Sequence, residues 1–379
     1  MEPKLVKSFQ ERLITKNIEF KGIYILFIMI IVIRIVFIFL NPLLTSDLSR
    51  NIFFGKHFWE YGLGIYDHTP LDIDPSYEVV DPISGLLSWP NNKYDYPIFH
   101  LLFFGIVVLL PSSILISKTI FTLFDLVNFF LIRSNERFEK IAWLYFIISS
   151  PFTSLEGQVT SITIFLFFAS FHLYRSNHQR LGYFFIAIGF QWKIIELILF
   201  PYYILKDLLE FRKETRIISG QELLIRIICF SIPLGILTII PFLFSGYLLN
   251  SMFFSGSYIS HEQQSPLYLL RPSFSSLFLV ITLSFILITW IKLGAQWEKG
   301  IDFIPLLELG FFYLLYPLST PWTWFYLFPC YFIIPKNEPL KVKYILLLLL
   351  CTFLIASLEF LVFTGGFERL ITALNPGWF

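Results

Sequence analysis

The sequence predicts an all-α fold, a polytopic transmembrane helix bundle of about eleven spans. Hydrophobic residues make up 56% of the 379 residues, charged residues make up 15%, and the mean hydropathy is +0.70. A soluble domain carries about 25% charged residues, so a water-soluble core is excluded. The apolar residues also gather in runs of the length that membrane helices need.

A helix that crosses the hydrocarbon core needs about 20 apolar residues. The first such run covers 22–40, and its flanks do not contain a small-residue cleavage site, so we expect a retained span. The remaining runs cover 98–111, 114–132, 141–154, 159–174, 182–204, 226–244, 274–293, 303–317, 323–335 and 342–363.

Lysine and arginine residues predict the orientation of these spans. With eleven spans, the basic residues of the N-terminal tail, of 206–226 and of 336–343 all face the cytoplasm. The loops 41–97 and 245–273 then face outward, as parts of a single membrane domain over 1–379. Three residues oppose this arrangement, Arg133, Arg137 and Lys140. We expect the inner membrane in a prokaryote, or the endoplasmic reticulum in a eukaryote.

The net charge argues against a nucleic-acid-binding protein, and the cysteines argue against a protein held together by zinc or disulfides. The net charge of +1 provides no field for nucleic acid. The three cysteines, Cys229, Cys330 and Cys351, lie in apolar runs without the spacing of a zinc site or a disulfide framework.

The first outer loop is longer than a simple connection, since most connections have about 2–6 residues. It opens with Asp47–Tyr61, whose mixture of apolar and charged residues predicts an amphipathic helix in the membrane interface. Gly62 and Gly64 are expected to end this helix. An acidic, irregular stretch over 67–81 follows, and the loop ends at Tyr94–Pro97.

Asp47 is the main catalytic candidate. At a membrane surface, a carboxylate whose pKa is raised by burial and a nearby phosphate could deprotonate an acceptor hydroxyl. Aspartate is also a favoured residue at the start of a helix, and the two roles are compatible. Further along the loop, Asp72 and Asp74 suggest either a divalent-cation site or a solvated acidic loop.

Polar residues outside the first loop provide further candidates. In the second outer loop, His261 and Arg271 could bind a lipid phosphate or could be ordinary loop polarity. Lys193 and Glu196 lie three residues apart in the run 182–204, so they could pair on one helix face. Alternatively, Lys193 could reach Glu156 or Gln158, or bind a lipid phosphate. Trp322 and Trp324 suit either an interfacial aromatic belt or a wall for a sugar or prenyl chain.

The order of these features resembles the GT-C glycosyltransferases, in particular the mannosyltransferases that use polyprenol- or dolichol-phosphate-mannose. That family carries an Asp soon after the first span, then a Gly-x-x-Tyr element and a Tyr-x-Tyr-x-Pro-like element. It also carries a Gly-Gln element, a Lys in span six and an aromatic element near the tail. The similar segments here are Asp47, Gly62–Tyr66, Tyr94–Pro97, Gly157–Gln158, Lys193 and Trp322–Pro329.

The resemblance implies an inverting transfer of a sugar, with mannose expected, from a polyprenyl-phosphate donor to a lipid- or glycan-linked acceptor on the outer face. Asp47 is the implied general base. The residues expected at the donor phosphate are His261, Arg271 and Lys193. Those expected at the sugar or acceptor are Tyr66, Tyr94, Asp95, Tyr96, Trp322 and Trp324. Membrane lipids and an accessory membrane subunit are the other expected partners, nucleic acid is not, and a divalent cation stays open as a cofactor.

Two other functions remain open. A transporter or lipid flippase predicts internal repeats and broken helices at matching positions, whereas the sequence shows no repeat and its polarity gathers in the outer loops. A non-catalytic subunit that binds a lipid-linked sugar would differ from the enzyme only in the role of Asp47.

Overall fold

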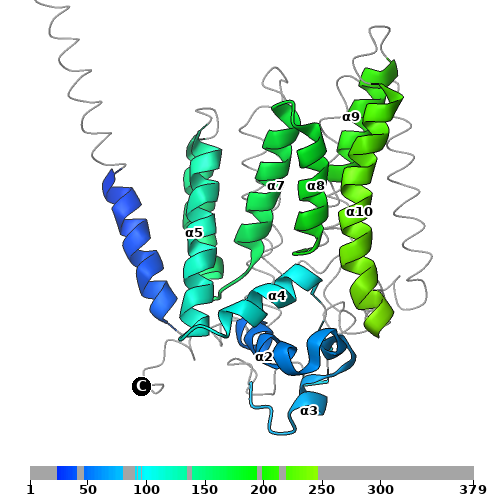
Figure 1. The fold of residues 1–379 in the computed structure, drawn as a ribbon. Helices are drawn as coiled ribbons and strands as arrows, with labels where there is room; N and C mark the ends of the chain where they lie inside the picture. Colours follow the sequence, from blue (N-terminus) through cyan, green and yellow to red (C-terminus); the bar gives the residue numbers. More distant parts are fainter. Residues whose placement is uncertain are drawn as a thin grey trace, which may run out of the picture.

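The computed structural model of the chain describes residues 24–40, 47–79, 90–91, 93–94, 96–134, 139–193, 199–212 and 219–245. Every regular element in these ranges is a helix, so the all-α prediction is confirmed for this part of the chain (Figure 1). Two of the described helices, Ser113–Arg133 and Gly220–Thr238, are long and apolar enough to cross a membrane by length and composition.

The described helices divide into an upright group and a group that lies across one end of it (Figure 1). The upright group contains Tyr24–Phe39, α5 (Ser113–Arg133), α6 (Glu139–Ser150) with the π-helical turn η3 (Pro151–Leu155), α7 (Thr160–Arg175), α8 (Gln179–Phe190), α9 (Leu199–Arg212) and α10 (Gly220–Ser245). The second group contains α2 (Asp47–Tyr61), the 3₁₀ helix η1 (Gly62–Asp67), α3 (Pro70–Ile73) and α4 (Ile98–Val107). We call the end of the bundle where this second group lies the α2 end.

Side-chain contacts establish the directions of the upright helices. Phe27 stacks on Phe129, and Lys118 Nζ donates to the carbonyl of Phe37, so the first helix and α5 are antiparallel. Helices α5 and α6 are antiparallel as well, because contacts join Arg133 to Glu139 and Thr122 to Ser154.

Helices α8 and α10 run in the same direction, with α9 opposed to them. Arg180 pairs with Glu222 near the two starts, and Gln191 Nε2 donates to Thr238 Oγ1 near the α2 end. The contacts of α9 with α10 run in the reverse order, with Phe200 on Phe230 and Asp207 on Arg226.

Helix α2 has the predicted bounds, and Gly62 ends it with a φ of +56°. It packs closely on α4, since a Cβ added to Gly55 would lie 2.5 Å from the carbonyl carbon of Phe104. Trp59 Nε1 also donates to the carbonyl oxygen of Gly105 at 2.7 Å. Because its neighbour α4 is covered in apolar side chains, α2 is anchored on the bundle and is not an isolated surface helix.

The prediction of a span over 98–111 is wrong. Helix α4 has 10 residues and is therefore about 15 Å long, half of the roughly 30 Å hydrocarbon core. It lies across the α2 end (Figure 1). The chain turns after Val107, where Pro111 cannot continue a helix and Ser112 adopts a left-handed φ of 58°.

The prediction of one continuous span over 182–204 is also wrong. Helix α8 ends at Phe190, and α9 begins at Leu199 in the opposite direction. An apolar run reports burial from water but not chain direction, so a pair of short antiparallel helices has the same composition as one span. The acidic stretch 67–81 is likewise more regular than expected, because it contains α3.

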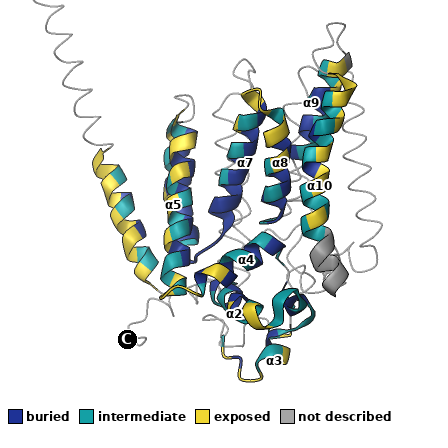
Figure 2. Cartoon of the chain, in the orientation of Figure 1, coloured by how far each residue is buried: buried dark blue, intermediate teal, exposed yellow. Residues whose placement is uncertain are grey.

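Figure 2 shows exposed residues along the outer helices of the bundle, and many of them are large apolar residues. The first helix is exposed along most of its length, and Phe39 is 72% exposed. On α10, Leu224, Ile228, Ile232 and Ile236 are exposed at a spacing of four residues, which makes one continuous stripe. Such faces are typical of helices that contact lipid.

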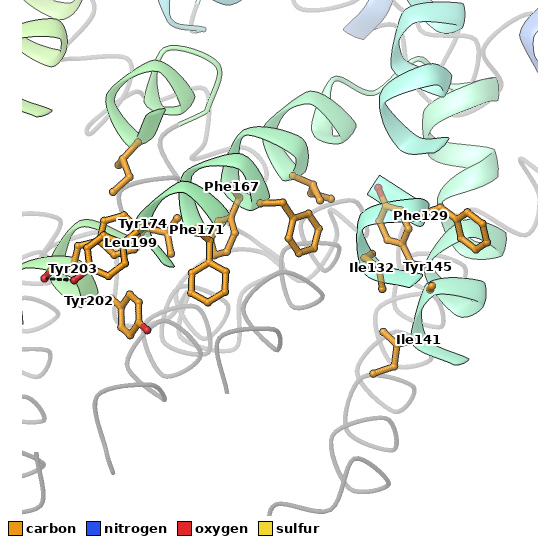
Figure 3. Packing of buried hydrophobic residues seen from close by; sticks show 14 of the residues in the cluster. Phe129, Ile132, Ile141, Tyr145, Phe167, Phe171, Tyr174, Leu199, Tyr202 and Tyr203 are labelled. Atoms are coloured by element: carbon orange, nitrogen blue, oxygen red, sulfur yellow. Dashed lines mark hydrogen bonds between the residues drawn. The ribbon is translucent and has the colours of Figure 1, made fainter. Parts of the chain in front are cut away.

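The interior of the bundle is aromatic. Figure 3 shows part of this core, in which Phe129 and Tyr145 lie near one end of the view and Tyr174 and Tyr203 near the other. Within this apolar surrounding, the Arg34 guanidinium pairs with Asp125 at 2.8 Å and donates to the carbonyl of Phe146 at 2.6 Å. This pair joins the first helix to α5 and α6.

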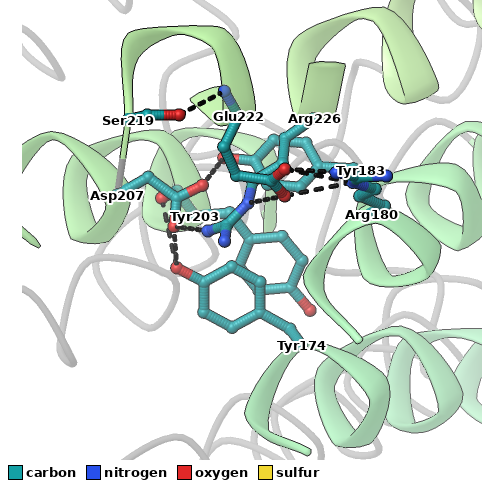
Figure 4. Close-up of polar contacts among 8 residues, drawn as sticks. All are labelled: Tyr174, Arg180, Tyr183, Tyr203, Asp207, Ser219, Glu222 and Arg226. Atoms are coloured by element: carbon teal, nitrogen blue, oxygen red, sulfur yellow. Dashed lines mark hydrogen bonds and ion pairs between the residues drawn. The ribbon is translucent and has the colours of Figure 1, made fainter. Parts of the chain in front are cut away.

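A polar network ties α7, α8, α9 and α10 together at the end opposite to α2 (Figure 4). Asp207 accepts from Tyr174 at 2.6 Å and from Tyr183 at 2.9 Å, and it pairs with Arg226 at 2.8 Å. These three contacts join the four helices in one network, to which the Arg226–Glu222 pair within α10 adds a contact of 3.1 Å.

Candidate functional site at the α2 end

Four segments that lie far apart in the sequence meet at the α2 end: the first turn of α2, residues 93–100, residues 156–160 and residues 191–193. The backbone N–H of His100 donates to the carbonyl of Gln191 at 3.4 Å. Lys193 Nζ lies 3.4 Å from Thr160 Oγ1. A Cβ added to Gly157 would lie 2.4 Å from Leu48 Cδ2, so this glycine packs directly against α2.

Asp47 is the first residue of α2 and is half-buried. Its carboxylate therefore lies at the positive end of the helix dipole, a common position for acidic side chains. Tyr77 is within electrostatic range of Asp47: burial raises the pKa of Tyr77 to about 12, Arg50 opposes this rise, and the Asp47 charge adds to it. An ionised carboxylate is the form that a general base requires.

Arg50 is a residue that our interpretation of the sequence did not single out. Only 5% of it is exposed, and its Nη2 donates to the carbonyl of Lys93 at 2.8 Å. Arg50 follows Asp47 by three residues, which places both on neighbouring faces of one helix turn. The i, i+3 spacing of an acid and a base on a predicted helix was therefore the signal that could have revealed it.

Gly157 determines how the polar residues beside it approach α2. The π-helical turn η3 ends α6, and Gly157 then adopts a φ of +69°, a conformation that favours glycine. Glu156 and Gln158 are 1% and 5% exposed, so the predicted Gly-Gln element is buried beside the first turn of α2. The structure thus brings this element and the neighbourhood of Asp47 together.

Lys193 differs from the sequence-based prediction. It lies beyond the end of α8 and outside any helix, so the expected placement in the middle of a span is wrong, whereas the expected pairing with Glu196 stays a prediction. Glu196 itself lies outside the described residues. After α8 the chain turns and brings Lys193 into contact with Thr160, two residues beyond the buried Gln158. This position is close to the alternative interpretation of the sequence, in which Lys193 reaches Glu156 or Gln158.

Three predicted aromatic residues form part of the framework around His100. Tyr66 and Tyr94 are fully buried, and the Tyr66 hydroxyl donates to the carbonyl of Tyr96 at 3.0 Å. The Tyr94 hydroxyl lies 2.5 Å from His100 Nδ1, and the ring of Tyr96 stacks on His100 at 4.0 Å. These contacts hold the loop on α4, and a role for the tyrosines in binding a sugar stays a prediction.

His100 is neutral. Burial, followed by the positive charges of Lys193 and Arg50, lowers the pKa of His100 well below its ordinary value. Its Nε2 is buried and has no hydrogen-bond partner among the described residues, as is also the case for Asn51 Oδ1, Gln158 Nε2 and Gln191 Oε1. Buried polar atoms are nearly always paired, so these four atoms are unusual within the part of the chain that the structure describes.

Asp72 and Asp74 serve as local caps. Asp72 Oδ2 accepts from the backbone N–H of Thr69 at 2.8 Å, and Asp74 Oδ1 accepts from the Ser76 hydroxyl at 2.6 Å. These bonds hold the pKa of each carboxyl below its ordinary value. No group of three metal-ligating side chains occurs among the described residues, and a divalent cation as a cofactor stays a prediction.

The other predicted site residues, Asp95, His261, Arg271, Trp322 and Trp324, lie outside the described residues, as does the second outer loop 245–273. Of the predicted set, the structure brings Asp47, Tyr66, Tyr94, Tyr96 and Lys193 to the α2 end.

No protein-family model, no curated protein and no solved structure matches the chain. The chemistry of the α2 end itself is therefore the basis for a function. It combines the Asp47 carboxylate at the start of α2 with two cations and several neutral hydrogen-bonding atoms. Of the cations, Arg50 is 5% exposed and Lys193 contacts the buried Thr160.

Proposed function

We propose that the chain is a multi-pass membrane glycosyltransferase that moves a sugar from a polyprenyl-phosphate donor to a lipid- or glycan-linked acceptor. Mannose is the sugar that the resemblance to GT-C enzymes suggests. Asp47 is the general base, and the α2 end holds the reacting groups on the outer face of the membrane. An inner membrane or the endoplasmic reticulum would supply such a donor.

The observation that supports this proposal is the meeting of Asp47 with Arg50 and Lys193 at one end of the bundle. Transfer from a lipid phosphate needs a base for the acceptor and positive charge for the departing phosphate. Both cations act on His100, which indicates that they lie within electrostatic range of one position. The neighbouring neutral atoms suit the hydroxyl groups of a sugar.

The proposed step uses these groups in one displacement. The Asp47 carboxylate takes the proton from the acceptor hydroxyl while that oxygen forms a bond to the anomeric carbon. The bond from this carbon to the phosphate oxygen breaks, and its electron pair leaves with the lipid phosphate. Arg50 and Lys193 stabilise the phosphate charge, so no acid is required, and attack opposite to the leaving group inverts the anomeric centre.

The exposed apolar faces and the positions of three arginines support the proposed orientation of the bundle in a membrane. Arg133, Arg175 and Arg180 all lie at the end opposite to α2, where the positive-inside rule predicts the cytoplasm. The eleven-span prediction placed Arg133 on the outer side. Without a crossing at α4, Arg133 lies on the cytoplasmic side and agrees with the positive-inside rule. The antiparallel pair of α8 and α9 returns the chain to the same side.

The first test is transfer from a panel of radiolabelled polyprenyl-phosphate sugars, with purified protein in detergent and a membrane lipid extract as the acceptor. We expect transfer by the wild type and a loss of at least about 100-fold in Asp47→Asn, since general base catalysis contributes about 10²–10⁴-fold. Glu60→Gln, at an exposed position of the same helix, is the matched control. Full activity of Asp47→Asn would exclude the catalytic role of this residue.

Lipid transport is a second candidate function, since Lys193 is a charged residue that follows α8 within an apolar run, and such residues often lie on transport pathways. Proteoliposomes separate the two functions. A transporter would move a fluorescent polyprenyl phosphate between leaflets without any transfer of sugar, with a dependence on Lys193 and no dependence on Asp47.

A further inference from the structure

A pocket of about 440 Å³ lies on the side of α2 that faces away from the buried polar atoms. Its wall is formed by α2 on one side and by the segment that follows α3 on the other. Pockets that bind small molecules usually have volumes of about 300–1,000 Å³, so this one has room for a sugar unit. Its main lining side chains are Ser49, Phe53, Asp74, Ser76, Tyr77 and Glu78.

The lining combines hydroxyl groups, carboxylates and two aromatic rings. Phe53 and Tyr77 meet at 4.7 Å with an interplanar angle of 71°, so they form a corner of the pocket. Asp74 and Glu78 provide hydrogen-bond acceptors for hydroxyl groups. A sugar ring presents apolar C–H faces and hydroxyl edges, which fit a wall of this kind.

The same lining disfavours an anion. Two carboxylates line the pocket, and the Ser76 hydroxyl holds the pKa of Asp74 below its ordinary value, so Asp74 is ionised at neutral pH. A phosphate would be repelled by both carboxylates. The cations that would attract it, Arg50 and Lys193, belong to the buried cluster and do not line the pocket.

The periodicity of α2 separates the pocket from the buried cluster, and Asp47 is linked to the pocket through its charge on Tyr77. Ser49 and Phe53 lie four residues apart and share one face of the helix. Asn51 and Phe54 lie on the other side, towards the buried cluster. Asp47 is at the end of the helix where both faces begin, and its charge acts on Tyr77 in the pocket wall.

We propose that this pocket binds the acceptor, and that it recognises a neutral, hydroxyl-rich sugar unit. The inference rests on the proposed function, in which the acceptor hydroxyl must contact Asp47 and attack the anomeric carbon on the face opposite to the donor phosphate. The two sides of α2 then sort the substrates by charge: the neutral acceptor enters the acidic pocket, and the anionic donor binds at the cationic cluster.

Kinetics of two pocket variants provide the first test. In the transfer assay, Glu78→Gln and Ser49→Ala should each raise the apparent KM for the acceptor about 10-fold, with the KM for the donor unchanged. Each substitution removes one hydrogen-bond partner of the acceptor and leaves the cationic cluster intact. Glu60→Gln, an exposed carboxylate of α2 outside the pocket, is the control and should leave both constants unchanged.

Binding without turnover provides the second test. Saturation-transfer NMR with methyl α-mannoside, methyl β-glucoside and methyl β-galactoside should detect binding of at least one glycoside to the wild type. Ser49→Trp, which fills the pocket, should abolish the signal while the melting temperature is retained, and inorganic phosphate should not compete.

The outcomes distinguish this inference from the proposed function. Glycoside binding that Ser49→Trp abolishes, in a protein with no transferase activity, would support the pocket and refute the transferase. Transfer with an unchanged acceptor KM in Glu78→Gln and Ser49→Ala would overturn the pocket and leave the transferase standing. The absence of both binding and transfer would overturn the two together.

Discussion

Arg34 and Asp125 show what a single buried charge does in this protein. Each side chain is 1% exposed, and Asp125 also accepts from the Tyr145 hydroxyl. Replacing one partner of a buried ion pair leaves an uncompensated charge, which typically costs about 3–5 kcal/mol. The pair therefore attaches the first helix, and with it the chain that leads to Asp47, to the rest of the bundle.

We expect Asp125→Asn to lower the free energy of unfolding by about 3 kcal/mol, because it leaves Arg34 charged and buried. The measurement is thermal unfolding of the protein in detergent. The double variant Arg34→Met with Asp125→Leu should regain most of the loss, since an apolar pair of similar size avoids the cost of desolvation. Equal unfolding temperatures for wild type and Asp125→Asn would contradict this account.

Arg50 illustrates a functional residue whose importance depends on its surroundings. A single arginine in a predicted amphipathic helix is ordinarily a solvated surface charge. Its 5% exposure and its bond to the Lys93 carbonyl make it a buried cation beside Asp47. The contact of α2 with Lys93 causes this change, and the i, i+3 spacing from Asp47 is the one local feature that points to Arg50.

Helix α2 depends on contacts with its neighbours for its position. Gly55 lets the backbone of α4 approach, and Gly157 lets the turn before α7 approach. Two close contacts at separate points of one helix determine both its distance and its angle to the bundle. Asp47, at the first residue of α2, therefore has a position that depends on Gly55 of its own helix and on Gly157 of another segment.

Gly157→Ala should destabilise the protein by about 1–3 kcal/mol, because alanine is strained at a φ of +69° and its Cβ would meet Leu48 Cδ2 at 2.4 Å. Thermal unfolding and the transfer assay both report this change. The matched control is Gly64→Ala, since a Cβ there meets nothing within 4 Å. A Gly157→Ala protein as stable and active as the Gly64→Ala protein would show that this contact does not position α2.

The whole bundle has one end that carries the candidate site and another that carries exposed arginines and the Asp207 network. If the chain spans a membrane as we propose, its two ends face different solutions, and the positive-inside rule predicts that the arginine end faces the cytoplasm. In this arrangement the short antiparallel helices α8 and α9 enter and leave from the cytoplasmic side, and α4 stays at the outer side.

Cysteine labelling tests this orientation. In a background without Cys229, Cys330 and Cys351, an impermeant maleimide added to intact cells should label Pro75→Cys, beside α3. Ser176→Cys, in the turn between α7 and α8, should react only after the membrane is permeabilised, because it lies at the opposite end. Labelling of Ser176→Cys in intact cells would instead agree with eleven uninterrupted spans and reverse our assignment.

Local patterns alone predicted several features correctly. The bounds of α2 followed from its amphipathic composition and from Gly62, and the all-α class followed from the apolar runs. These features depend on side-chain polarity and on backbone conformations over a few residues. The directions of α8 and α9 and the short length of α4 could not be predicted in this way, because an apolar run has the same composition whether it crosses, turns back or lies across the bundle end.

By itself, the sequence determined an all-helical, apolar chain with a carboxylate at the start of a helix beyond its first apolar run, because polarity and helix periodicity are local properties. Only the tertiary structure decided which distant residues join Asp47. It buried Arg50, carried Lys193 out of a helix to Thr160, and placed Gly157 against Leu48. Such meetings depend on how helices turn and pack over long separations in the chain, and no local pattern encodes them.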